Sequence, residues 1–308
     1  HSANQKGQQK MNTRNIRSSM MMIGLIGVTS AELLAQSHWT SKASMPTARS
    51  ALAACVVDGK VYALGGGPAS QVALPTVEQY DPVTDTWTKK ADMPTARAFF
   101  DVGVVDGIIY VFGGLAAAGG SVVSTVEAYD PATDTWTTRA PMPTPRVFLS
   151  CGVTNGKIYA IGGLRSGSTV GSADVEEYDP ATDTWTRRAD VPRGRCVGCC
   201  ATVNGVIYFV GGGYTGGTGV DQSVTTVEAY DPATDSWTTT APMHTARGSF
   251  AASVVHGKIY TIGGCANAYN SSELATVEAY DPTTDTWSPM PSMQVKHKAL
   301  ASAVVSGK

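Results

Sequence analysis

Five arginines recur at nearly regular intervals and are the side chains best suited to recognise a ligand. They stand just before similar apolar runs, and a histidine takes the sixth place: Arg49, Arg97, Arg146, Arg195, Arg247 and His297. A guanidinium presents its N–H donors in a fixed fork that matches a carboxylate. If the fold gathers these residues around one opening, they form a site for an anion.

Recurring glutamates offer a structural alternative for the same arginines. Each repeat also contains one glutamate at a fixed position: Glu78, Glu127, Glu176, Glu228 and Glu278. Each arginine could therefore form an ion pair with a glutamate between neighbouring repeats.

The positions two residues beyond each arginine differ from repeat to repeat. They are Ala51, Phe99, Phe148, Val197, Ser249 and Ala299. A mixed apolar and aromatic lining of this kind could hold a sugar ring or an apolar side chain. It could equally fill a narrow core.

The elements that position these residues follow from the tryptophans. All six stand at the same place in a repeat: Trp39, Trp87, Trp136, Trp185, Trp237 and Trp287. Their separations are 48, 49, 49, 52 and 50 residues. A period near 50 residues indicates a propeller or a solenoid.

Each repeat contains four short runs that have the composition of strands. In the first repeat they are "ARSALAACVV", "KVYALGG", "TVEQYDP" and "TDTWTKK". Asp58-Gly59 joins the first two, and such pairs favour a two-residue type I′ hairpin. An Asp-Pro turn joins the last two. Each repeat is therefore predicted to be a four-stranded antiparallel sheet, a blade, that buries its faces only against its neighbours.

With these repeats the sequence resembles the Kelch-repeat β-propeller family, in its bacterial, secreted type. The resemblance rests on five Gly-Gly doublets, on the spaced tyrosines and tryptophans, and on Met-Pro-x-x-Arg before the first strand, and it covers residues 37–308. It implies an all-β propeller, for which we predict six blades. A strand near 36–41 would complete the last blade, whose first strand is 299–305. Two middle strands of that blade would be absent.

One face of the predicted propeller, the loop face, carries all the length variation. The loops between the second and third strands, 67–75, 115–124, 164–173, 213–225 and 265–275, differ in length and sequence. Loops on a rigid scaffold often carry recognition, although exposed loops also vary without function. Candidate contacts in them are Arg165, Tyr214, Asp221, Tyr269 and Asn270.

Metal and cofactor chemistry is not predicted. Cys196, Cys199 and Cys200 have no partner pair at zinc spacing. Cys151 and Cys200 hold the same offset in adjacent repeats, so they could form a disulfide or remain buried free thiols. A copper site of the galactose oxidase kind, from a relative by fold, would need two histidines and a tyrosine together. His244 and His297 have Tyr214 and Tyr269 in nearby loops, but nothing pairs a cysteine with a tyrosine convincingly.

The N-terminal residues are predicted to lie outside the propeller. Residues 1–35 are interpreted as upstream residues plus a secretory signal peptide, because Arg14 and Arg17 precede the apolar run Met20–Val28. That run is too short to span a membrane. The propeller then occupies 36–308, with repeats at about 49–97, 98–146, 147–195, 196–247 and 248–297 and a partial repeat at 298–308. The expected location is secreted or periplasmic.

The predicted function is a secreted or periplasmic binding scaffold that presents its loops to a protein or glycan ligand, as the resemblance implies. The formal net charge is −2 and the sequence has no basic stripe, so a nucleic-acid partner is not predicted. One alternative is a sugar-processing enzyme of the sialic-acid mutarotase type, in which the arginines hold the carboxylate and Glu or His297 moves a proton. Another is one module of a longer surface protein.

Overall fold

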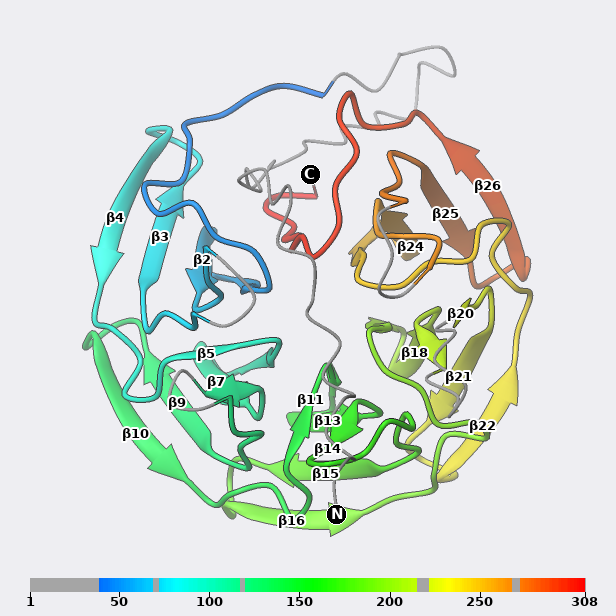
Figure 1. The fold of residues 1–308 in the computed structure, drawn as a ribbon, viewed down its shortest axis with the longest axis horizontal. Coiled ribbons are helices and arrows are strands. Elements are labelled where there is room, and N and C mark those ends of the chain that lie inside the picture. Colours follow the sequence, from blue (N-terminus) through cyan, green and yellow to red (C-terminus); the bar gives the residue numbers. More distant parts are fainter. Residues whose placement is uncertain (1–38, 69–71, 117–119, 215–221, 268–271, 308) are drawn as a thin grey trace, which may run out of the picture.

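The computed structural model describes residues 39–68, 72–116, 120–214, 222–267 and 272–307. These residues form strands and turns and contain no helix, so none of their segments provides a helix that could cross a membrane. Five four-stranded antiparallel sheets stand around a common centre, in chain order (Figure 1). The prediction of an all-β propeller is confirmed.

Each sheet is a meander whose strands follow one another from the centre to the rim. The first holds β1 (Ala53–Val57), β2 (Lys60–Leu64), β3 (Val77–Asp81) and β4 (Thr86–Lys90). The second holds β6 (Asp101–Val105), β7 (Ile108–Phe112), β9 (Val126–Asp130) and β10 (Thr135–Arg139). The third holds β12 (Ser150–Thr154), β13 (Lys157–Ile161), β15 (Val175–Asp179) and β16 (Thr184–Arg187).

The last two sheets repeat the pattern, and short ribbons lie on the loop face. The fourth sheet holds β17 (Cys199–Val203), β18 (Val206–Val210), β21 (Val227–Asp231) and β22 (Ser236–Thr239), and the fifth holds β23 (Ala251–Val255), β24 (Lys258–Ile262), β25 (Val277–Asp281) and β26 (Thr286–Met290). The two-stranded ribbons are β5 (Arg97–Ala98) with β8 (Leu115–Ala116), β11 (Arg146–Val147) with β14 (Leu164–Arg165), and β19 (Gly213–Tyr214) with β20 (Gln222–Ser223).

The predicted type I′ hairpins are present between the first and second strands of each sheet. Asp58 and Gly59 have φ of 50° and 70°, and Asn155 and Gly156 have 52° and 70°. Both central residues of such a turn need positive φ, which explains the choice of Asp, Asn and Gly there.

A set of hydrogen bonds at the rim joins each sheet to the segment that precedes it and accounts for the recurring Tyr, Asp and Trp. The N–H of Ala91, which follows the first sheet, donates to the Asp134 carboxylate of the second. The Trp136 indole N–H donates to the Ala91 carbonyl, and the Tyr129 hydroxyl donates to Asp134. The same contacts recur at the other four rim positions.

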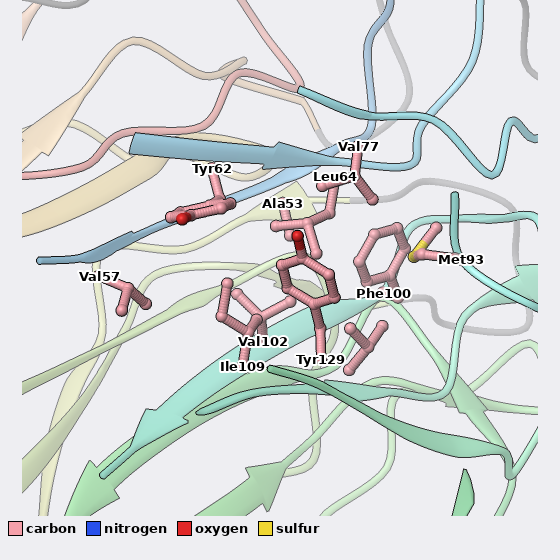
Figure 2. Close-up of a cluster of buried hydrophobic side chains, with 11 residues drawn as sticks. Ala53, Val57, Tyr62, Leu64, Val77, Met93, Phe100, Val102, Ile109 and Tyr129 are labelled. Carbon is pink, nitrogen blue, oxygen red and sulfur yellow. The ribbon is translucent and has the colours of Figure 1, made fainter. Parts of the chain in front are cut away.

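The hydrophobic core lies between neighbouring sheets rather than within one. Figure 2 shows the cluster between the first and second sheets, where Leu64 and Val77 face Phe100, Ile109 and Tyr129. A single blade could not bury these side chains, so the sheets stabilise one another.

Six complete blades are not confirmed, because the described residues form five four-stranded sheets. The predicted strand near 36–41 lies partly outside these residues, and its described part, 39–41, has no strand. The segment 299–305 has none either. Nevertheless Trp39, Leu300 and Val304 pack on the fifth sheet, against Tyr260 and Val277.

We expect Gly113→Ala to lower the free energy of unfolding by about 1–3 kcal/mol. Gly113 has φ +61°, and an added Cβ would lie 2.5 Å from the Arg146 carbonyl oxygen of the next blade. Urea denaturation measures the change. Gly120→Ala is the matched control, since Gly120 has φ +68° but no atom within 4 Å of the added Cβ. An equal loss in both variants would contradict the close approach as the reason for glycine at 113.

Candidate functional site

Six backbone segments meet at the centre of the propeller in a closed ring of hydrogen bonds. The N–H of Phe99 donates to Ala51, that of Phe148 to Phe99, and that of Val197 to Phe148. The ring continues through Ser249 and Ala299 and returns to Ala51, with N···O distances of 2.8–3.2 Å. Five of the segments enter the five sheets, and the C-terminal segment supplies the sixth.

All six ring residues have positive φ, between 51° and 58°. This conformation is uncommon for residues with a β-carbon, and bulky ones such as Phe and Val are outliers in it. It interrupts the apolar run that was predicted as one strand from Ala48 to Val57, so β1 begins only at Ala53. Strain at such positions persists where the surroundings enforce it, and it is common at binding sites.

A hollow of about 110 Å³ opens at the ring. Each of the six segments contributes the ring residue and the one after it: Ala51, Leu52, Phe99, Phe100, Phe148, Leu149, Val197, Gly198, Ser249, Phe250, Ala299 and Leu300. Ser249 supplies the one polar side chain in this lining.

Large and small side chains are unevenly distributed around the hollow, although the backbone around it repeats regularly. Phe99, Phe148 and Val197 stand on consecutive segments, and the Phe99 and Phe148 rings lie 4.7 Å apart. We call these three residues the aromatic wall. On the other side the ring carries the small residues Ser249, Ala299 and Ala51. A ligand entering the hollow would therefore lie over the small residues and against the wall.

The five arginines do not line this hollow, which corrects the prediction of an arginine-lined opening. Arg49, Arg97, Arg146, Arg195 and Arg247 are each at most 1% exposed. Arg97 donates to Glu127 at 2.6 Å and to the carbonyls of Gly113 and Thr125 at 3.1 and 2.9 Å. The other four pair in the same way with Glu78, Glu176, Glu228 and Glu278. A buried charge needs such partners because it has left water.

Each ion pair lies within one blade, whereas the structural alternative placed it between neighbouring blades. Arg97 directly precedes the innermost strand of the second blade, and Glu127 is on β9 of the same blade. The arginine joins neighbouring blades through its backbone, since its carbonyl accepts the N–H of Gly66 from the first repeat. His297 shares this backbone role, since its carbonyl accepts the N–H of Gly264, and its own N–H donates to Leu274. Its side chain is half-buried, and it is absent from the lining.

The candidate loop contacts are only partly described. Asp221, Tyr269 and Asn270 lie outside the described residues. Arg165 is half-exposed and forms an ion pair with the buried Asp174. Burial raises the pKa of Asp174, but hydrogen bonds from Arg165, Ser172 and Arg187 outweigh this effect and hold the pKa below its ordinary value. The Tyr214 ring lies 3.6 Å from the Arg193 guanidinium. The structure thus brings neither Arg165 nor Tyr214 into the hollow's lining.

The cysteines in the described residues are free thiols. Cys151 packs between the second and third blades, whereas Cys200 packs between the third and fourth, so the disulfide considered from the sequence is not formed. No group of His, Cys, Asp or Glu among the described residues has the arrangement of a metal site.

Comparisons with known proteins agree with this architecture. A family model described as "KLHDC2/KLHL20/DRC7 Kelch-repeats domain" matches residues 29–213. The Kelch motif matches residues 195–244 and 246–294. The chain belongs to the Kelch-repeat family. The repeats found in the sequence are thus Kelch repeats, and the buried arginines and Gly-Gly doublets are part of how this chain builds them.

One of the relatives found resembles this chain over a short segment, and the other resembles it in fold alone. A mouse protein named "Influenza virus NS1A-binding protein homolog" is 44% identical over 48 residues, which is 16% of this chain and 8% of that protein. A solved structure entitled "Structure of YjhT" superposes with a TM-score of 0.70, over 82% of this chain and 87% of that one, at 19% identity. This likeness shows the fold.

Proposed function

We propose that this Kelch propeller is a binding scaffold whose loop face holds a protein partner, with one apolar partner side chain seated in the central hollow. The observation that carries this proposal is the hollow itself, about 110 Å³ and lined by eleven apolar residues and one serine. Apolar pockets with few polar groups are the usual binding places for such groups. The aromatic wall suits them because an aromatic ring buries a large area with little loss of side-chain freedom.

A protein partner is favoured over a glycan by size and chemistry. An apolar cavity of about 150 Å³ encloses one benzene, so the open hollow of about 110 Å³ suits an aliphatic side chain better than a whole sugar ring. Sugar hydroxyls would also need polar groups, and the lining offers one hydroxyl, from Ser249.

The sugar-processing alternative, of the sialic-acid mutarotase type, receives less support. It requires unpaired arginines and an acid or base that faces the substrate. The five arginines are buried against glutamates, and no titratable side chain belongs to the described lining of the hollow. We therefore do not adopt an enzymatic function.

Two further expectations remain proposals. We propose that a complete propeller has six sectors, which the six-membered backbone ring and the packing of Trp39 and Leu300 on the fifth sheet support. We also propose that the protein is secreted or periplasmic, because the segment before residue 36 has the sequence pattern of a secretory leader.

A selection from a displayed peptide library tests the proposed function, with a glycan array beside it. We expect peptides that share one apolar anchor residue and lose binding when that residue is replaced by glycine. Binding confined to acidic glycans, and weakened by salt, would overturn the protein-scaffold proposal in favour of the sugar alternative.

A further inference from the structure

Asp101 is the one charged side chain on the innermost strands β1, β6, β12, β17 and β23. The first and fifth blades have alanine at the equivalent positions, Ala53 and Ala251. The fold therefore does not require a carboxylate there. Withdrawing a carboxylate even partly from water is unfavourable, so the presence of half-buried Asp101 in one blade calls for an explanation.

The carboxylate of Asp101 joins the second blade to the third. One of its oxygens accepts the hydroxyl of Ser150 at 3.2 Å and the backbone N–H of Cys151 at 2.8 Å. Ser150 in turn accepts the N–H of Cys200 from the fourth blade at 2.8 Å. A chain of hydrogen bonds thus crosses three consecutive innermost strands.

The residues of this chain closely follow those of the aromatic wall in the sequence. Asp101 stands two residues after Phe99, and Ser150 stands two residues after Phe148. Cys200 stands three residues after Val197. The large residues of the backbone ring and this chain of hydrogen bonds therefore occupy the same three blades, while alanine follows the small residues Ser249 and Ala51 two residues on.

We propose that Asp101 is a positioning residue for the aromatic wall, and that its ionisation makes the placement of Phe99 against Phe148 depend on pH. The ionised carboxylate accepts charge-assisted hydrogen bonds, which are stronger than those to the neutral acid. Protonation therefore loosens the link between the two strands that carry the aromatic pair. The effect on a partner rests on the proposed function, whereas the movement of the wall does not.

The relevant pH is set by the surroundings of Asp101. Burial raises its pKa from 3.8 to about 6, although hydrogen bonds from Cys151, Val102 and Ser150 oppose the rise. The titratable groups facing it are the thiols of Cys55 on β1, Cys151 on β12, and Cys199 and Cys200 on β17. Burial raises the pKa of all four thiols, that of Cys200 to about 12, so they stay neutral between pH 5 and 8.

The sign for stability follows from the same pKa shift. Because the folded state holds the proton more tightly than the unfolded one, Asp101 lowers stability as pH rises from about 4 to about 6. At neutral pH the fold thus retains a carboxylate that costs stability while holding the wall.

The test places 4-fluorophenylalanine at position 99 of the full chain and follows its ¹⁹F resonance from pH 5 to pH 8. We expect the shift to titrate with a midpoint near pH 6. The same label at Phe250, which lines the hollow one position after the ring residue and is followed by Ala251, is the control and should not titrate.

Two variants identify the group responsible. The titration at position 99 should be abolished by Asp101→Asn and also by Asp101→Ala. The second substitution introduces the residue that the first and fifth blades have at this position. Persistence of the titration in either folded variant, or a flat response in the protein with Asp101, would overturn the proposal. Since no ligand is present, failure here leaves the binding-scaffold proposal standing.

Discussion

Arg97→Ala should lower the free energy of unfolding by about 3–5 kcal/mol, the range for breaking a buried ion pair. The substitution leaves Glu127 buried, 3% exposed, without its counter-charge. It also removes donors from the carbonyls of Gly113 and Thr125. Urea-induced unfolding followed by tryptophan fluorescence measures the loss.

Two companion variants separate the buried charge from the packing of the side chain. Arg97→Met with Glu127→Leu should recover most of the stability, because apolar residues of similar volume often replace a buried pair without loss. Lys89→Ala removes an exposed ion pair with Asp92 and should change little. A loss below about 1 kcal/mol for Arg97→Ala would contradict the structural role of the arginines.

Ser249→Phe should weaken the binding of a selected peptide roughly thirtyfold, which corresponds to the 2 kcal/mol or more that a central anchor contributes. The new ring would fill the side of the hollow that Ser249, Ala299 and Ala51 leave open. Phe99 and Phe148 already hold the equivalent positions at φ of 57° and 58°, close to the 51° of Ser249, so the backbone accepts phenylalanine. We therefore expect stability to change by no more than about 1 kcal/mol.

Calorimetric titration of the peptide against both proteins measures this effect. Ser236→Phe, the same substitution on the exposed rim strand β22, is the control and should leave the affinity unchanged. Equal affinity for the wild type and Ser249→Phe would place the binding surface away from the hollow.

The propeller fold was predictable because the sequence features that specify it, turn residues and a regular repeat, can be recognised locally. Asp58-Gly59 specifies a hairpin by its own conformational preference, and the spacing of Trp87 and Trp136 gives the period of the blades. The family resemblance rested on the same features, and the comparisons confirmed the Kelch repeats but not the bacterial, secreted type. Blade count was less predictable, since 299–305 resembles an innermost strand in composition but lacks a strand beside it in the described structure.

The site was less predictable because it depends on the direction of side chains and on an unusual backbone. The spacing of Arg97 and Glu127 could not show that both point into the sheet, nor that they belong to one blade. Nothing in the sequence indicates positive φ at Phe148, since a bulky residue disfavours it. Asp101 went unnoticed, although comparison of the repeats would have found it, as alanine stands at position 53.

Hydrogen–deuterium exchange of the full chain with and without the selected peptide tests most directly whether the hollow and the loop face bind the partner. We predict slowed exchange at the ring amides, such as Phe99 and Phe148, and in the loop 164–173. Slowed exchange confined to the Asp58-Gly59 hairpin and its equivalents, which lie on the opposite face, would contradict the account.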